Sequence, residues 1–572
     1  MRRKRRWIVL GLIVIVVIVV LLARREPYIA PGSFLVVPIG GTYLDAQPSD
    51  VLGHLLHAQE KVLSDLLLEL EKVRVDARFK GVLVKITPLD IDFAKLQELR
   101  GALQRVKASG KRVIAWLSGE ADTGNREYYL ASVADRVYVS ENTLLPLLGL
   151  RATYLFLGKV WEHLHVDMRV EQIGAYKTFG DFLSRQEMSN PHREMADSLL
   201  DSFNQQFLSD IASSRSMTVA QLSALVDNAI LTPEDYRRAG LIDGIRYVDE
   251  LLTELAEPPE ETLKTVMLPT YQRVKATSLG LMKGPRVAVV YGVGGVVTGK
   301  SGWNALGESM GADTIIDALQ DAARDDTIRA MVFRIDSPGG SALASDLIWH
   351  AVKSAAQKKP VIVSMSGAAA SGGYYMAAAA DKIVAQPGTL TGSIGIVFSL
   401  PNVRELFDRL GVHSETLVRG QYAGLFDTLQ SWTPEERQHV QRVIESLYQT
   451  FTRKVADGRG LSVQEVDRIG RGRVWTGVQA KQLGLVDVLG GLDTALRVAK
   501  EEAGIPAEAN VRLVFYPEAQ GLLASLLERL QEQMHINLRL PAELERFLPS
   551  LLPVVMNGSA PALLMPVAMH VR

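Results

Sequence analysis

Apolar runs of five to eight residues alternate with amphipathic stretches of a dozen or more along most of the chain. In the first half, the runs at residues 34–41, 81–86 and 112–116 have the length and composition of buried strands. The stretches 62–73 and 93–106 carry apolar residues at helical spacing. Strands that alternate with helices of this length predict an α/β fold with a mainly parallel sheet.

The same order of elements is expected again in the second half, with strands at residues 286–291, 330–335 and 360–364. The sequence Glu-Tyr-Tyr-Leu-Ala-Ser-Val-Ala-Asp-Arg-Val at 127–137 aligns with Gly-Tyr-Tyr-Met-Ala-Ala-Ala-Ala-Asp-Lys-Ile at 373–383, an offset of 374 − 128 = 246. Further matches are Gly149 with Gly395 and Gly174 with Gly420 at 246, and Thr232 with Thr476 at 244. A nearly constant offset indicates a duplicated domain.

The duplication divides the chain into two repeats with a punctuated junction between them. Prolines and a glycine interrupt the sequence between the repeats. The predicted segments are 1–28 for a basic end and membrane anchor, 29–256 for the first repeat, 257–284 for a linker, 285–505 for the second repeat and 506–572 for a C-terminal tail.

The N-terminus has the pattern of a membrane anchor. Five basic residues at 2–6 precede an uncharged run at 7–23, which Arg24 and Arg25 follow. The run reaches about 26 Å as a helix, near the lower limit for crossing a bilayer. The larger positive charge before the run predicts a cytoplasmic N-terminus and places the rest of the chain on the outer side of the membrane. A cleaved signal peptide is the alternative, but basic residues stand where small cleavage-site residues are expected.

Composition excludes several classes of protein. The chain has 572 residues, a formal net charge of -1 and no cysteine. The charge gives no reason to expect nucleic-acid binding, and the missing thiols exclude disulfides, cysteine nucleophiles and cysteine-ligated metals. Neither an HExxH motif nor an EF-hand loop occurs, so we expect no metal and no cofactor.

The strongest candidate for chemistry is Ser371. It follows an apolar strand at 361–363, and Gly372 and Gly373 lead from it into an alanine-rich stretch with good helix propensity. Glycines allow a substrate backbone to come close, and amides at a helix start can stabilise an oxyanion. These features predict a nucleophile, although an isolated Ser-Gly-Gly also suits a turn of small residues that serves only packing.

The two repeats differ where this chemistry is expected. At offset 246, Ser371 corresponds to Asn125, whereas Lys177 in Gly-Ala-Tyr-Lys corresponds to Ala423 in Gly-Gln-Tyr-Ala. One repeat keeps the serine and the other keeps the lysine, which predicts one composite site across the junction of the repeats. A buried lysine can act as a general base when burial lowers its pKa. No motif places a histidine for this role, although a solvated surface lysine is the alternative interpretation of Lys177.

These motifs together resemble the signal peptide peptidase A proteins in their long, duplicated form. The resemblance rests on Ser-Gly-Gly-Tyr-Tyr, Thr-Leu-Thr-Gly-Ser-Ile-Gly and Ser-Pro-Gly-Gly-Ser in the second repeat and Gly-Ala-Tyr-Lys in the first, and it covers roughly residues 30–505. It implies a membrane-anchored serine endopeptidase with a Ser/Lys dyad, built on tandem domains of the Clp protease and crotonase fold. By this resemblance the catalytic residues are Ser371 as nucleophile, Lys177 as base and Ser393 as the residue that orients the lysine, with oxyanion donors at Gly339 or Gly340 and at Gly372.

The resemblance also implies partners and a location. The expected substrates are apolar unfolded peptides such as signal-peptide remnants, and the expected assembly is a homo-oligomer, a tetramer. The location implied is the bacterial inner membrane, crossed once, with the catalytic part in the periplasm. Two alternatives stay open, namely a crotonase-like acyl-CoA enzyme and a catalytically inactive membrane scaffold, which would be favoured if Ser371 and Lys177 lay far apart.

Overall fold

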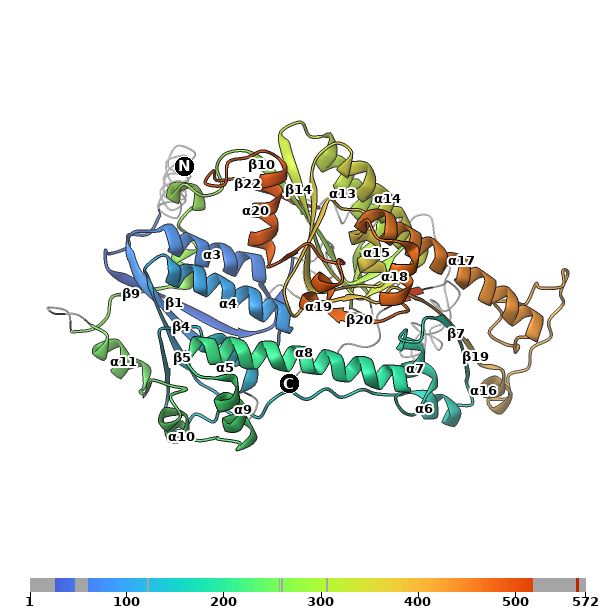
Figure 1. The fold of residues 1–572 in the computed structure, drawn as a ribbon, viewed down its shortest axis with the longest axis horizontal. Coiled ribbons are helices and arrows are strands. Elements are labelled where there is room, and N and C mark those ends of the chain that lie inside the picture. The colour runs from blue at the N-terminus through green and yellow to red at the C-terminus, as the bar shows by residue number, and fades with distance from the viewer. Residues whose placement is uncertain are drawn as a thin grey trace, which may run out of the picture.

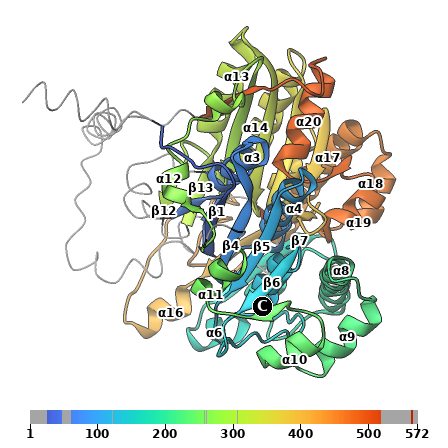
Figure 2. The ribbon, with the colours of Figure 1, turned by 90° about the vertical axis from the view of Figure 1, so that its left-hand side faces the viewer.

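The computed structural model describes residues 26–46, 60–120, 123–256, 258, 261–304 and 307–517 and the backbone of 562–564. Two largely parallel sheets form its centre, one from each repeat (Figure 1). Figure 2 shows them adjacent in the body of the molecule, with helices α9 and α10 at the end away from α13. The mixed α/β architecture with two repeats agrees with the prediction from sequence.

The first sheet has the strand order β8-β6-β5-β4-β1-β9 and is parallel throughout. The strands of the first half are β1 (Ser33–Gly41), β2 (Tyr43–Leu44), β3 (Lys61–Val62), β4 (Phe79–Leu89), β5 (Arg112–Leu117), β6 (Arg136–Val139), β7 (Asp167–Ile173), β8 (Gly244–Ile245) and β9 (Thr265–Met267). Its helices are α3 (Leu63–Val75), α4 (Phe93–Ala108), α5 (Asn125–Ala131), α6 (Gly158–His163), α7 (Phe179–Ser184), α8 (Asn190–Ser214), α9 (Val219–Asp227), α10 (Pro233–Arg238), α11 (Val248–Glu254), α12 (Leu268–Tyr271) and the 3-10 helix η1 (Ala276–Leu279).

The second sheet has the order β20-β18-β16-β14-β10-β22, and β17 and β21 extend from β16. The strands of the second half are β10 (Arg286–Val293), β11 (Gly295–Val297), β12 (Gly302–Asn304), β13 (Gly307–Gly311), β14 (Ile328–Ser337), β15 (Gly339–Ser341), β16 (Val361–Ala370), β17 (Lys382–Ala385), β18 (Leu390–Gly392), β19 (Ile396–Asn402), β20 (Val474–Thr476), β21 (Val488–Leu489), β22 (Arg512–Tyr516) and β23 (Ala562–Leu564). Its helices are α13 (Ala312–Arg324), α14 (Ala342–Ala356), α15 (Gly372–Ala377), α16 (Arg404–Arg409), α17 (Pro434–Arg459), α18 (Val463–Ile469), α19 (Gly477–Gln482) and α20 (Leu492–Glu502).

Each parallel sheet is covered on both faces, which explains why its strands are continuously apolar in sequence. In β1, Leu35 and Val37 belong to the core that includes α3 and α4, whereas Phe34 and Val36 belong to a smaller core with Leu251 of α11. Successive side chains of a strand point to opposite faces, so both sets are buried.

A third sheet joins the two repeats. Its order is β12-β13-β11-β15-β23-β19-β7, so it combines strands of the second repeat with β7 of the first. Strands β7 and β19 pair antiparallel over their full lengths, from Ile173 opposite Ile396 to Asp167 opposite Asn402. Figure 1 shows β7, α6 and α7 beside β19 and α16, at the other end of the long helix α8 from the first sheet. This arm brings Lys177 of the first repeat to Ser371 of the second.

A buried ionic cluster also fixes the repeats against each other. The guanidinium of Arg334, on β14, lies 2.6 Å from Glu98 of α4 and 3.0 Å from Asp45. The ammonium of Lys95 lies 2.7 Å from Asp336, the residue two places after Arg334. Breaking one partner of a buried pair leaves an uncompensated charge and costs about 3–5 kcal/mol, so the cluster holds one relative position of the two repeats.

Two of the predicted segments contain short strands that belong to the sheets of the repeats. The segment predicted as a linker contains β9, which pairs with β1 at the edge of the first sheet, and the segment predicted as a tail contains β22, which pairs with β10. Both are short edge strands, which give little periodic signal in sequence. All the predicted segment boundaries stay predictions. The predicted anchor at 7–23 lies outside the described residues, among which no helix has the length and apolar content needed to cross a membrane.

Candidate active site

Ser371 lies in the turn between β16 and α15, where the sequence predicted it. Its backbone has φ 55° and ψ −112°, a left-handed conformation that a serine rarely adopts and that costs on the order of 1–3 kcal/mol. The Ser371 N–H donates to the carbonyl of Gly392 at 2.8 Å, which helps to hold the turn. A strained strand-to-helix turn of this kind presents a side-chain hydroxyl to a substrate.

Lys177 reaches Ser371 from the first repeat. It follows β7, is fully buried, and its Nζ donates to Ser371 Oγ at 2.6 Å. The Tyr176 N–H donates to the Arg471 carbonyl, and a Cβ on Gly472 would lie 2.4 Å from Lys177 N, so the lysine turn packs closely on the second repeat. The predicted juxtaposition of the serine and the lysine is therefore present.

Burial lowers the pKa of Lys177 well below its ordinary value of 10.5. Desolvation disfavours the charged ammonium, and among the described residues no carboxylate forms an ion pair with Nζ that would restore it. A neutral amine at 2.6 Å from a hydroxyl can accept its proton.

Ser393 forms the third corner of the site. Lys177 Nζ lies 3.0 Å from Ser393 Oγ and 3.1 Å from the Ser393 carbonyl oxygen. Ser393 also has a positive φ, 52°, and its N–H donates to the Arg473 carbonyl at 2.7 Å. These two contacts direct the lysine amine toward Ser371, which is the geometry expected of a residue that orients a base.

The three predicted oxyanion glycines lie together beside Ser371. A Cβ on Gly372 would lie 3.2 Å from the Gly339 Cα and from the Gly340 N, and 2.4 Å from Ser345 Oγ. The Gly339 N–H already donates to Ser337 Oγ at 3.2 Å. A side chain at Gly372 would therefore push strand β15 (Gly339–Ser341), the glycine strand, away from Ser371.

An extended segment runs along this glycine strand. Strand β23 pairs antiparallel with β15, with Gly340 opposite Leu563, and Val397 of β19 lies opposite Ala562. The backbone of 562–564 thus lies between the glycine strand and the strand that follows Ser393. Sequence reasoning assigned no structure to this part of the tail, because three residues among prolines carry no periodic pattern.

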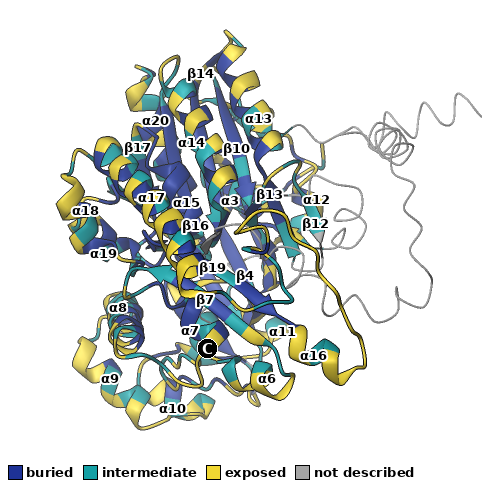
Figure 3. Cartoon of the chain, turned by 90° about the vertical axis from the view of Figure 1, so that its right-hand side faces the viewer, coloured by how far each residue is buried: buried dark blue, intermediate teal, exposed yellow. Residues whose placement is uncertain are grey.

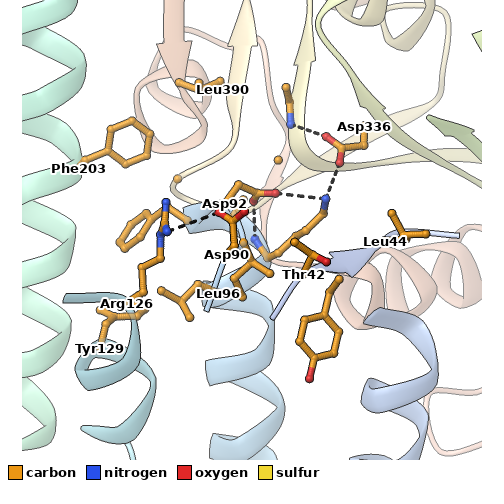
Figure 4. Close-up of a pocket in the computed structure, with 18 of the residues that line it drawn as sticks. Thr42, Leu44, Asp90, Asp92, Leu96, Arg126, Tyr129, Phe203, Asp336 and Leu390 are labelled. Carbon is orange, nitrogen blue, oxygen red and sulfur yellow. Dashed lines mark hydrogen bonds and ion pairs between the residues drawn. The ribbon is translucent and has the colours of Figure 1, made fainter. Parts of the chain in front are cut away.

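A cavity of about 480 Å³ lies between the repeats, and Gly367 and Ala368 of β16 form part of its lining (Figure 4). Tyr129 and Phe203 of the first repeat line it together with Leu390 and Asp336 of the second. Asp336 accepts a hydrogen bond from the N–H of Ala368 at 3.0 Å. None of Ser371, Lys177 and Ser393 lines this cavity, so it is separate from the dyad.

The pKa of Asp336 is raised above its ordinary value by burial and by the carboxylates of Asp45 and Asp92, although Lys95 opposes the shift. The sequence analysis assigned no role to Asp336. Its partners come from the other repeat, so no local pattern indicated the cluster.

Comparisons with known proteins agree with this geometry. The model of peptidase family S49 matches residues 105–262 and 353–506, and the Clp protease model matches residues 307–389. The chain is 34% identical to the chloroplastic serine protease SPPA of Arabidopsis thaliana over 77% of this chain and 66% of that protein. It is 30% identical to Protease 4 of Salmonella typhi over 86% of this chain and 79% of that protein.

A shorter relative matches part of the chain. A putative signal peptide peptidase SppA of Enterococcus faecium is 32% identical over 34% of this chain and 57% of that protein. The family model spans both repeats and more than half of the 572 residues, and the relatives that align over most of the chain are proteases. The chain therefore belongs to peptidase family S49 and is a serine protease.

Proposed function

We propose that this protease cleaves peptide bonds with Ser371 as nucleophile and Lys177 as general base. The observation that carries the proposal is the 2.6 Å contact between Lys177 Nζ and Ser371 Oγ, in a buried site where desolvation lowers the pKa of the lysine. Ser371 Oγ attacks the carbonyl carbon as its proton passes to Nζ. The ammonium then gives that proton to the leaving amine, and water, activated by the same amine, hydrolyses the acyl-enzyme.

The developing oxyanion needs donors beside Ser371. We assign this role to the amide of Gly372 and, from the glycine pair, to that of Gly340, because the Gly339 amide already donates to Ser337. The close approach of Gly372 to Gly340 supports this choice. Ser393 holds the lysine in position and does not contact the carbonyl.

The proposed substrates are extended, unfolded, apolar peptides. Strand β23, with the sequence Ala-Leu-Leu, pairs with the glycine strand, which indicates that a chain can be held there by backbone hydrogen bonding. Apolar residues around the site, such as Met376 and Ile394, favour aliphatic side chains over charged ones. The Enterococcus relative is named a signal peptide peptidase, so signal-peptide remnants are the natural class.

The proposed location is the bacterial inner membrane, with the described residues on the periplasmic side and the subunits associated as a homo-oligomer. The support is the basic segment 2–6 and the apolar run 7–23, which would anchor the protein beside its substrates. Protease added to intact spheroplasts, which expose the periplasmic face of the inner membrane, should digest the catalytic part and spare the N-terminus. Protection of the whole chain would reverse this topology.

Peptide hydrolysis tests the proposed chemistry and the substrate class together. The protein truncated before Glu26 is incubated with apolar and charged peptides of equal length, with Ser371→Ala as control. Apolar peptides should be cut faster, with small or aliphatic residues at the cleaved bond. Equal rates on charged peptides would contradict the substrate class, and acyl-CoA binding without any cleavage would favour the crotonase-like alternative.

A further inference from the structure

The ladder between β14 and β16 is interrupted shortly before the proposed active site. Ile335 lies opposite Met365, but Ser337 lies opposite Ala369, so residues 366–368 form an insert in β16 that faces a single residue of β14. Both strands are buried over most of their lengths (Figure 3). After the insert, β14 leads to the glycine strand and β16 leads to the proposed nucleophile. The ladder holds only one pair there, so other contacts must fix these two ends against each other.

Two residues of the insert donate hydrogen bonds to buried or half-buried carboxylates. Ser366 Oγ donates to Asp45 Oδ2 at 2.7 Å, and the Ala368 N–H donates to Asp336 Oδ1 at 3.0 Å. Asp336 is the residue of β14 at which the register shifts, and its side chain binds an amide that has no β14 partner in the ladder. Asp45 comes from the first repeat, so the insert is held from both repeats.

A single ammonium joins these carboxylates. Lys95 Nζ, on α4 of the first repeat, lies 2.7 Å from Asp336 and 3.0 Å from Asp45 (Figure 4). It also lies 3.2 Å from Asp92, and a Cβ on Gly367 would lie 2.6 Å from Asp92 Oδ2. Each of the three residues of the insert therefore contacts a carboxylate that forms an ion pair with the same lysine.

The two lysines that the first repeat brings to this region are in opposite states. Burial favours the neutral form of Lys95, but the three carboxylates around it outweigh burial and raise its pKa well above 10.5. Burial lowers the pKa of Lys177 instead. Lys95 is thus a permanent cation that binds carboxylates, whereas Lys177 supplies a neutral amine beside Ser371.

The duplication provides no second copy of the Lys95–Asp336 contact. Helices α3 and α4 correspond to α13 and α14 at an offset of 249, since 312 − 63 = 249 and 342 − 93 = 249. At that offset Lys95 corresponds to Ala344 and Asp336 corresponds to the exposed Thr87, so the matching positions cannot form an ion pair. The ladder of β4 with β5 also runs through residues 81–86 without a register shift. The lysine and the insert therefore accompany the repeat that carries the proposed nucleophile.

We propose that Lys95 is a positioning residue for the peptidase reaction, because its ammonium fixes the insert of β16 and so sets the place of Ser371 relative to the glycine strand. Lys95 acts through its carboxylate partners and not on the substrate. The inference rests on the proposed function, in which Ser371 is the nucleophile and the glycine strand supplies an oxyanion donor. Geometry of this kind has a large effect on rate, since a displacement of about 1 Å can cost about 100-fold.

Replacement of the ammonium tests the proposal. In full-length Lys95→Met, kcat on a short apolar peptide should fall by about 10- to 100-fold while KM stays within about twofold, because substrate binding does not need the exact place of Ser371. Lys95→Arg keeps the charge and should recover most of the lost kcat. Lys107→Met removes another lysine of α4, one that pairs with Asp135 at 2.9 Å, and should keep the parent kcat. A parent kcat in Lys95→Met, or an equal loss in Lys107→Met, would overturn the proposal.

Two further readouts separate positioning from a general loss of structure. A loosened contact between the repeats would also displace Lys177 and would shift the ascending limb of the pH profile. We expect this limb at the parent pH in Lys95→Met, whereas the rate at which a fluorophosphonate labels Ser371 should fall as much as kcat does. A displaced limb, or an unchanged labelling rate, would contradict the positioning role.

A second variant keeps the proposal testable if Lys95→Met does not fold. Asp336→Asn retains an oxygen for the Ala368 N–H but turns an NH₂ group toward the ammonium of Lys95. It should lower kcat and the labelling rate together, by a smaller factor than Lys95→Met, and leave KM unchanged. Unchanged kcat in a folded Asp336→Asn variant would refute the link between the lysine and the insert.

Ser371→Ala, measured in parallel, separates this inference from the proposed function. An inactive Ser371→Ala together with a fully active Lys95→Met would refute the positioning role and leave the proposed chemistry in place. Hydrolysis by Ser371→Ala at the parent rate would refute the proposed chemistry itself, and the positioning role with it.

Discussion

The two repeats share a strand-to-helix corner, and they fill it in opposite ways. In the second repeat, Ser371 is followed by Gly372, and the corner lies open to the glycine strand. In the first repeat, Glu127 of α5 is buried and its carboxylate accepts hydrogen bonds from the amides of Leu89 at 2.6 Å and Gly124 at 2.7 Å. A carboxylate of the chain itself therefore occupies two backbone donors at this corner of the first repeat.

The lysine turn shows the reverse division. The first repeat keeps Lys177 and inserts it into the second, whereas the second repeat has Ala423 at the matching position. In the proposed mechanism, one duplicated unit supplies the base and the other supplies the nucleophile. The contrast teaches that a duplicated site can lose half its residues in each copy when the copies pack against each other.

The strongest test of this difference between the repeats is to truncate the side chain at the same position in each repeat and to compare the loss in kcat/KM. Ser371→Ala should lower kcat/KM on an apolar peptide by at least roughly 10⁴-fold, and Lys177→Ala by as much, because members of a catalytic unit are not additive. Asn125→Ala, at the matching position of the first repeat, should leave kcat/KM within about twofold. A comparable loss for Asn125→Ala would show that both corners take part in catalysis.

The second prediction concerns the residue after the corner position, which is Gly372 in the second repeat and Arg126 in the first. Gly372→Ala places a Cβ 2.4 Å from Ser345 Oγ and 3.2 Å from the Gly340 N, which should displace an oxyanion donor. The expected loss in kcat is about 10²–10³-fold. Arg126→Ala, the matching change in the first repeat, should leave kcat unchanged, as measured under saturating peptide. Full activity in Gly372→Ala would remove this amide from the mechanism.

The pH profile tests the lysine rather than the serine. Burial lowers the pKa of Lys177 below 10.5, and only the deprotonated amine can accept the Ser371 proton. As pH rises through that lowered pKa, kcat/KM should therefore increase, by about tenfold per pH unit on the ascending limb, and reach its plateau below pH 10.5. The measurement is kcat/KM across a pH series with the fold monitored by circular dichroism. A limb centred near 10.5 would mean that the base is solvated.

Strand β23 pairs with the glycine strand of the second repeat, and we expect its removal to have a smaller effect on the kinetic constants than the changes above. Ending the chain after Pro517 removes it and should raise the fraction of open sites, which lowers KM by a few-fold and leaves kcat unchanged. Initial rates on a short peptide measure both constants. A fall in kcat after truncation would instead assign the segment a part in building the site.

The fold and most of the site were accessible from sequence because duplication makes each repeat a reference for the other. The strands β4, β5, β10 and β14 were predicted within a few residues, and the split between Ser371 and Lys177 appeared as soon as the repeats were aligned. Alignment of the repeats therefore identified Ser371 and Lys177 as candidates, which local secondary-structure propensity could not do.

The remaining features depend on tertiary contacts that no local pattern encodes. The positive φ angles of Ser371 and Ser393 are imposed by the turns around them, since serine has no preference for that conformation. The cluster of Arg334 with Glu98 and Asp45 joins residues more than 200 positions apart. The two amide contacts of Glu127 were equally hidden, although a glutamate aligned with Gly373 of the other repeat was the available signal.

Glu127→Gln should lower the stability of the protein and should have the smallest effect on activity among these variants. The neutral amide can accept from only one of the two backbone donors with its oxygen, and its NH₂ group would face the other, so the change should cost about 1–3 kcal/mol. Urea unfolding followed by circular dichroism measures the loss. Glu141→Gln, at an exposed position, is the matched control and should change the unfolding midpoint little. Hydrolysis below the unfolding transition should match the parent, because the carboxylate supports a corner without a nucleophile. If activity fell while stability held, the first-repeat corner would have a catalytic role, and the division between the repeats would have to be abandoned.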